Sequence, residues 1–312
     1  MFNSTHTLVG LAIARTGLDR WAPCATATAL IATNLPDIEI VTGLANTRTF
    51  VEYHRGITHS FIGIPVLSLA LALGIYIFSG SFWKTFITAL LVMATHPALD
   101  YANTYGLRPF LPFGQTWYYG DTLFIIDPYL DLIMIAGVLA GYRFPPIRRL
   151  SAWLSLLVAL GYTGIRVELH GQARNHLANY TATRPGFQSL AVFPRMASPR
   201  VWDGIIGNNE DLIKVRIDTR YGVEREIARL PKGVSSEVIG HALTAPSAIA
   251  FIGFARFPVT RIEGTEFGYR VTFIDFRFYN EMTERSFAAE VLLDQSLRVV
   301  KDSLGFNASV KE

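Results

Sequence analysis

Cysteine is nearly absent from this chain of 312 residues, because Cys24 is the only one. A single cysteine cannot form an intrachain disulfide, so the chain is not a disulfide-stabilised scaffold. An excess of one charge is also missing, since 28 Lys and Arg stand against 25 Asp and Glu and the formal net charge is only +3. The basic residues do not gather into one long run. These features give no support to nucleic-acid binding.

Charge is scarce in the first half of the chain. Residues 1–168 contain 19 charged residues, whereas the shorter range 169–312 contains 34. The mean hydropathy of +0.29 therefore averages a membrane-like part and a part with an ordinary soluble composition. We predict a membrane-embedded helical domain over residues 1–168 and a soluble domain over residues 169–312.

Six apolar stretches in the first half predict a membrane α-helical bundle of about six helices. The clearest is Phe61–Ser79, which has no charged residue and, at about 1.5 Å per residue, nearly crosses the hydrocarbon core. The other stretches are Thr7–Ala14, Trp21–Pro36, Thr85–Leu99, Leu123–Tyr142 and Leu150–Ile165. We expect the first two helices to be short.

The basic residues of the connecting loops predict the orientation of this bundle. If the helices alternate sides, six Lys and Arg fall on one side of the membrane and three on the other. The positive-inside rule then places the more basic side in the cytoplasm and the second half of the chain outside it. We therefore expect a multi-pass protein of the bacterial inner membrane with a periplasmic C-terminal domain.

Imidazoles and carboxylates gather at the predicted outer level of the bundle. His96 and Asp100 are four residues apart, so one helix face carries both. This pair suits a divalent ion such as zinc, iron or manganese, and a hydrogen-bonded His–Asp pair is the alternative. The alternating helices bring further ligand-type residues to the same level, namely His6, Asp37, His59 and Asp121. We predict a metal site with one to three ions, because ionisable groups in membrane segments are costly and usually functional.

Other polar residues near this level have two or more interpretations. Asp127 precedes Pro128 and is either a further ligand or the N-cap of the next helix. His54 is a ligand, a catalytic acid or a group behind the ligands. Arg55 stands between His54 and His59 and is either a phosphate-binding catalytic residue or a lipid-headgroup anchor. Glu39 has the pattern of a solvated loop residue.

Taken together and in order, these blocks resemble the bacterial membrane-bound, metal-dependent hydrolase family of the inner membrane. The matching pieces are His6 with Gly10, Asn34-Leu-Pro-Asp37, His54-Arg-Gly-Ile-Thr-His59-Ser60, His96-Pro-Ala-Leu-Asp100, Gly120-Asp121 and Asp127-Pro128. The order of the histidines and aspartates is more distantly similar to zinc-dependent phospholipase C, although the later His and Glu ligands of that enzyme have no clear match. The resemblance implies zinc as the preferred ion and hydrolysis as the reaction.

The second half has the pattern of an α+β domain. Leu212–Thr219 alternates apolar and charged residues, which predicts a half-buried strand. Tyr269–Tyr279 and Phe287–Leu293 predict further strands, and we expect one antiparallel sheet with one or two helices. No catalytic motif occurs here. The domain could serve as a lid, select the substrate or bind a protein partner.

The leading hypothesis is a metal-dependent hydrolase that acts at the outer face of the membrane. The predicted substrate is a phosphoester, either a small molecule or a lipid-linked compound, and membrane lipids are expected around the helices. A transporter or ion carrier is the alternative, because intramembrane His and Asp also relay protons and bind ions. A membrane sensor with a structural metal is a third possibility.

Overall fold

The computed structural model describes residues 1–233, 236–280 and 285–309. The chain forms two compact units that interleave along the sequence. The first unit comprises Met1–Glu39, Arg55–Ala173 and Val192–Trp202, and the second comprises Ile40–His54, Arg174–Ala191 and Asp203–Glu312. The range 40–54 therefore leaves the first unit after Glu39, and the chain returns to it at Arg55.

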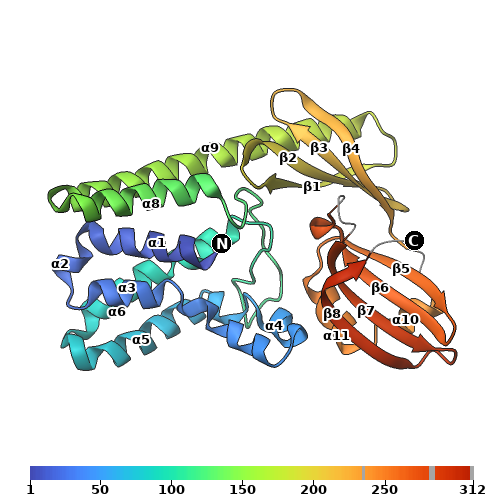
Figure 1. Ribbon diagram of the computed structural model, residues 1–312, viewed down its shortest axis with the longest axis horizontal. Coiled ribbons are helices and arrows are strands. Elements are labelled where there is room, and N and C mark those ends of the chain that lie inside the picture. The colour runs from blue at the N-terminus through green and yellow to red at the C-terminus, as the bar shows by residue number, and fades with distance from the viewer. Residues whose placement is uncertain (234–235, 281–284, 310–312) are drawn as a thin grey trace. The chain divides into compact units, whose positions relative to one another are not determined.

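The first unit is mostly helical (Figure 1). Its helices are α1 (Asn3–Ile13), α2 (Asp19–Trp21), α3 (Ala25–Ala32), α5 (Gly63–Ser79), α6 (Phe82–Met93), α7 (Thr95–Tyr101), α8 (Pro128–Arg143) and the first part of α9 (Arg148–Ala182). A π-helical turn, η1 (Ala14–Leu18), continues α1, and 3-10 turns occur at η2 (Leu35–Leu44), η3 (Ile57–His59) and η4 (Pro145–Ile147). Helices thus occur in all six ranges that the apolar stretches predicted.

Polar and special residues decide where several of these helices begin and end. The Asp127 carboxylate accepts hydrogen bonds from the backbone N–H of Tyr129 and Leu130, so α8 begins at Pro128 rather than at Leu123. The helix containing Pro97 is interrupted at Ala94, between α6 and α7. Pro97 accounts for this break, because the ring of a proline clashes with the preceding turn and the residue lacks an N–H.

Among the described residues, α9 is the one helix that is long and apolar enough to cross a membrane by itself. The stretch around α5 passes the same test only when it is joined to the bent helical segment before it. Helices α1 and α3 have 11 and 8 residues, or about 16 and 12 Å, which is short of a hydrocarbon core of about 30 Å. The predicted bundle of six membrane-crossing helices is therefore not confirmed.

Helices α8 and α9 meet through small side chains. A Cβ atom added to Gly137 would lie 2.3 Å from the Ser155 Cβ, and one added to Gly141 would lie 2.7 Å from the Ser151 Oγ. Such seams of small residues are typical of helices that pack within membranes. Large apolar side chains are instead exposed on the outside of α9, at Leu150, Leu154, Leu157 and Leu160.

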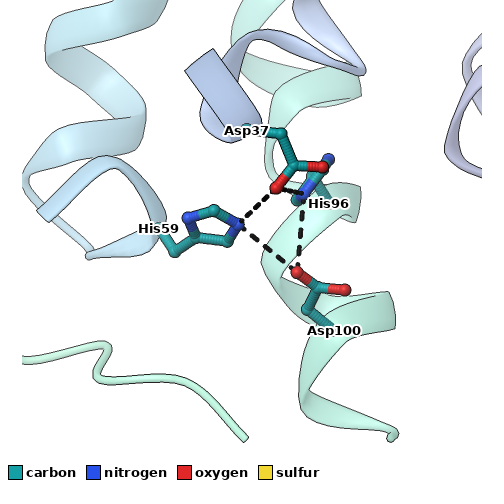
Figure 2. A group of neighbouring side chains, drawn as sticks. All are labelled: Asp37, His59, His96 and Asp100. Carbon is teal, nitrogen blue, oxygen red and sulfur yellow. Dashed lines mark ion pairs between the residues drawn. The ribbon is translucent and has the colours of Figure 1, made fainter. Parts of the chain in front are cut away.

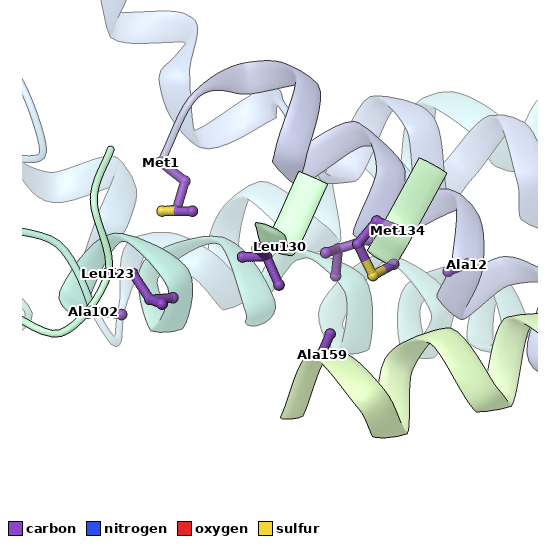
Figure 3. Close-up of a cluster of buried hydrophobic side chains, with 8 residues drawn as sticks. Met1, Ala12, Ala102, Leu123, Leu130, Met134 and Ala159 are labelled. Carbon is purple, nitrogen blue, oxygen red and sulfur yellow. The ribbon is translucent and has the colours of Figure 1, made fainter. Parts of the chain in front are cut away.

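The interior of the first unit is lined with small and flexible apolar residues (Figure 3). One buried cluster consists of Met1, Val9, Ala12, Ala102, Leu123, Leu130, Met134 and Ala159. Helices α1 and α3 approach so closely that a Cβ on Gly10 would lie 2.8 Å from the Thr33 Cβ. The Thr5 hydroxyl of α1 donates a hydrogen bond to the Asp131 carboxylate of α8, which links the two helices. This close packing holds α1, and with it His6, against its neighbours.

The C-terminal half contains two four-stranded antiparallel sheets, with strand orders β1-β2-β3-β4 and β5-β6-β7-β8. The strands are β1 (Gln188–Arg195), β2 (Ser198–Gly207), β3 (Asp211–Asp218), β4 (Gly222–Pro231), β5 (Pro258–Thr265), β6 (Gly268–Asp275), β7 (Arg285–Asp294) and β8 (Val299–Ser309). Helices α10 (Glu237–Ala242) and α11 (Pro246–Phe254) accompany the second sheet, and α4 (Thr47–Tyr53) contacts α11.

The three predicted strands are confirmed as β3, β6 and β7, but the prediction of one sheet is wrong because there are two. Strand β6 also ends earlier than predicted, at Asp275, because the Asp275 carboxylate caps the 3-10 turn η5 (Phe276–Phe278). The missed strands include β4, in which five of ten residues are charged or proline, so no apolar alternation marks it.

Candidate metal centre

Four side chains of the first unit converge on one point (Figure 2). They are Asp37, His59, His96 and Asp100, and each offers a ligating atom that lies within 4.8 Å of the others. His59, His96 and Asp100 are buried, and Asp37 is partly buried. The predicted meeting of residues that are distant in sequence is therefore present for these four.

Short helical turns present these side chains. His96 and Asp100 lie one turn apart on α7, Asp37 lies in the first turn of η2, and His59 ends η3. The turn of His59 folds tightly against the start of α5, since a Cβ on Gly63 would lie 1.8 Å from the Ile57 carbonyl oxygen. Glycine is required there, and its backbone N–H donates to the Ser60 hydroxyl.

The distances between the four residues match the spacing of ligands around a small cation. The His59 Nε2 lies 3.4 Å from the Asp37 Oδ1 and 3.3 Å from the Asp100 Oδ2. The His96 Nε2 lies 3.5 Å from each of the same two atoms. Two ligands that are each about 2.1 Å from a tetrahedral zinc ion are about 3.4 Å apart. The residues present therefore fit a divalent ion.

Buried nitrogens without hydrogen bonds give a second test of this fit. Among the described residues, the Nε2 atoms of His59 and His96 and both ring nitrogens of His6 are buried and have no hydrogen-bond partner. Buried polar atoms nearly always have a partner, so each exception needs an explanation. An ion bound to the His59 and His96 nitrogens would supply one.

Contacts behind the ligands fix the two imidazoles. The His96 Nδ1 lies 2.7 Å from the Thr33 carbonyl oxygen, which can only accept, so this nitrogen donates, and in the neutral ring that an ion binds Nε2 carries the free lone pair. The His59 Nδ1 lies 3.0 Å from the Thr58 hydroxyl, and that hydroxyl donates to Glu39. Both rings thus present Nε2 to the carboxylates.

Glu39 has a different position from the one we predicted. It is buried, with 8% of its surface exposed, and accepts hydrogen bonds from the Arg55 backbone N–H and the Thr58 hydroxyl. The interpretation as a solvated loop residue is therefore wrong. Glu39 joins the two ends of the range 40–54 and supports the side of the centre that contains His59.

Electrostatics favour the ionised carboxylates that a cation requires. Burial opposes the ionisation of Asp37, but the adjacent imidazoles of His59 and His96 outweigh it and lower the pKa of Asp37 below its usual range. Asp100 is in contact with the Met1 amine, with Arg55 at 3.1 Å and with the His6 Nε2 at 3.4 Å. Both acids are therefore ready to act as anionic ligands.

Arg55 contacts a residue of the centre and the loop beside it. Its guanidinium pairs with the Asp100 carboxylate and donates hydrogen bonds to the Asn103 side chain at 2.8 Å and to the Gly106 carbonyl at 3.1 Å. It is only 3% exposed, and its backbone is left-handed, with φ of +51°. The predicted contact with a substrate phosphate is untested. The contacts that are present orient Asp100 and hold the loop after α7.

The other predicted site residues lie in different places. His6 stacks on His96, with ring centroids 3.7 Å apart, so it lies directly beside the four-residue centre. Asp121 is buried with φ of +52° but is not one of the four.

Asp127 caps α8, which is the second of its two predicted roles, and its carboxylate also accepts a hydrogen bond from the Tyr162 hydroxyl. His54 belongs to the second unit and stacks on Phe50. Ligation by Asp121 and His54 stays a prediction.

Comparisons with known proteins match nearly the whole chain. A family model described as "YdjM inner membrane protein" matches residues 1–173, and one described as "YfhP C-terminal alpha/beta plait domain" matches residues 237–312. The chain is 25% identical to the "Uncharacterized protein YfhP" of Bacillus subtilis (strain 168), over 98% of this chain and 95% of that protein. No solved structure matches. Similarity to a hydrolase or to phospholipase C is not among these findings.

Proposed function

This chain belongs to the YdjM inner membrane protein family, and on that premise we propose that it is a membrane-bound, metal-dependent hydrolase. The observation that carries the proposal is the buried His/Asp centre, whose ligating atoms lie within 4.8 Å of one another. Two carboxylates and two imidazoles are a donor set that suits zinc and related divalent ions. We propose zinc as the preferred ion.

Each residue of the centre has a stated task in this proposal. Asp37, His59, His96 and Asp100 hold the ion, which when bound supplies Lewis-acid chemistry to a phosphoryl or carbonyl oxygen. The Thr33 carbonyl and the Thr58 hydroxyl fix the rings of His96 and His59, and such contacts keep ligands in a productive orientation. Arg55 positions Asp100 through its guanidinium.

The proposed substrate is a phosphoester at the outer face of the membrane. If the six helical ranges alternate sides of the membrane, six basic loop residues fall on the opposite face and three on this one, which supports this side. A reporter enzyme that is active only in the periplasm, fused after Glu312, should be active. Activity of a reporter that works only in the cytoplasm would place the centre on the inner face instead.

Metal analysis of the full chain purified in detergent tests the core of the proposal. We expect at least one divalent transition-metal ion per chain, and turnover of a generic phosphodiester that a chelator removes and zinc restores. A centre that holds metal but turns over no ester in a broad screen would contradict the hydrolase and leave a structural metal. Absence of metal from the purified chain, even after zinc is added, would contradict the assignment of these four residues as a metal centre.

A further inference from the structure

An apolar cavity of about 550 Å³ lies in the first unit, and His59 of the metal centre forms part of its wall. The start of α5, the junction of α6 and α7, and the loop over residues 107–118 supply the rest of the wall. Ile64, Leu90, Ala98 and Leu107 are typical of these residues. Cavities of roughly 300–1,000 Å³ that are mostly apolar with a few polar groups at one point are typical ligand sites.

Three aromatic rings border this cavity and pack edge to face. The ring centroids of Phe61 and Phe110 are 5.3 Å apart, and those of Phe110 and Tyr118 are 5.4 Å apart. The three residues are 68%, 48% and 40% exposed, respectively, although each also lines the cavity. Exposed aromatic side chains are typical of the level where hydrocarbon meets water in a membrane protein.

The chemistry of the cavity wall selects its occupant. Among the described residues that line it, none is Lys, Arg, Asp or Glu. A sugar or an ionic group would lose its water there without gaining partners, whereas an aliphatic chain is stabilised by the loss of water. In a protein of an inner membrane family, the surrounding bilayer supplies such chains.

We propose that this cavity binds an alkyl chain of a membrane phospholipid whose phosphate-bearing headgroup lies at the metal centre. The proposal rests on the proposed function and names its substrate class, because His59 belongs both to the cavity wall and to the centre. The chain would anchor the lipid, and the phosphoester would lie beside the His and Asp side chains.

A photocrosslinking phospholipid tests this placement without relying on turnover. The full chain in detergent is incubated with phosphatidylglycerol that carries a diazirine in one acyl chain, irradiated and digested, and the labelled peptides are mapped by mass spectrometry. We expect label on residues 61–65, 90–101 and 107–118. Ala98→Trp fills the cavity, and exclusion of about two methylene groups should lower this label about tenfold.

A matched control separates the cavity from lipid that merely surrounds the helices. Ala70 is exposed on α5 but does not line the cavity, so Ala70→Trp should leave the cavity label unchanged. Label on the exposed α5 residues Leu69 and Leu73 should be the same in the wild type, Ala98→Trp and Leu90→Trp. Because Ala98 lies between two proposed ligands, Leu90→Trp repeats the test at a cavity residue farther from them.

Metal content, measured on the same preparations, distinguishes failure of this proposal from failure of the hydrolase. Cavity label that is absent, or that is equal in wild type, Ala98→Trp and Leu90→Trp while metal is retained, would overturn the lipid proposal and leave the hydrolase standing. Cavity label that falls in both variants, but not in Ala70→Trp, would support the lipid proposal even if no ester is hydrolysed.

Discussion

The helical unit and the domain of the second sheet differ in whether particular buried polar groups have hydrogen-bond partners. In the sheet domain, the buried Arg277 guanidinium pairs with Asp275 at 2.7 Å and donates to the Phe254 carbonyl at 3.0 Å. In the helical unit, the Nε2 atoms of His59 and His96 are buried with no hydrogen-bond partner among the described residues. The buried Arg277–Asp275 pair of the sheet domain is satisfied from within, whereas the helical unit leaves the two imidazole nitrogens available for an ion.

This contrast separates a structural polar cluster from a binding site. A buried ion pair that is fully bonded holds a fold together only as long as both partners remain. A buried imidazole without a partner is costly in the absence of a ligand, so its presence points to one. Three substitutions would break or sharpen this distinction.

The largest effect is expected from Arg277→Ala in the sheet domain. Removal of one member of a buried pair leaves the Asp275 carboxylate uncompensated, which should lower the free energy of unfolding by about 3–5 kcal/mol. Chemical denaturation followed by the far-ultraviolet signal of the strands measures this loss. Metal content should stay the same, and a fall in metal would mean that the two sites are not independent.

The next effect is expected from His96→Ala in the helical unit. Loss of one of four proposed ligands should weaken zinc binding by about 100-fold or more, since even changes behind the ligands cost roughly 10–100-fold. Competition with a chromogenic chelator measures the affinity, and His241→Ala in α10 is the matched control. Equal affinity in the two variants would contradict the assignment of His96.

The smallest effect is expected from Glu39→Gln. Glutamine keeps the shape of the side chain but removes the negative charge that accepts from Thr58 and Arg55, so zinc affinity should fall by about tenfold. Glu52→Gln is the control, because Glu52 is more exposed and lies outside the centre, with its carboxylate 3.9 Å from Arg48. If both variants bind zinc like the wild type, Glu39 supports the chain path but not the centre.

The convergence of the four side chains follows from simple rules in the sequence, and their role as ligands stays a prediction. His96 and Asp100 are four residues apart on one helix, and the alternating helices return Asp37 and His59 to the same level. Helix positions follow from apolar stretches, and the helices are present in all six ranges. Helix lengths do not follow: the Asp127 cap decides where α8 begins, whereas no side-chain cap hydrogen bond marks the start of α1 or α3.

Roles that depend on long-range partners could not be predicted. The partner of Arg55 is Asp100, 45 residues away, and no local pattern indicates that contact. The burial of Glu39 has a usable signal in the sequence, which is the alternation Asp37-Ile38-Glu39-Ile40. In the structure the two isoleucines are more than half exposed, whereas Glu39 is buried and Asp37 is partly buried. Apolar residues outside and acids inside are typical of a polar site in a membrane protein. No such pattern in the sequence indicates that residues 40–54 belong to the second unit.

The spread of the centre along the chain also sets an order of events during synthesis. Asp37 emerges from the ribosome about 60 residues before Asp100, which is roughly 3–13 s at 5–20 residues per second. During this interval α1, α3 and the residues up to His59 have no α7 to face. The acid and imidazole of these early segments therefore have no partners on α7 until that helix has been synthesised, and only then can the polar cluster close.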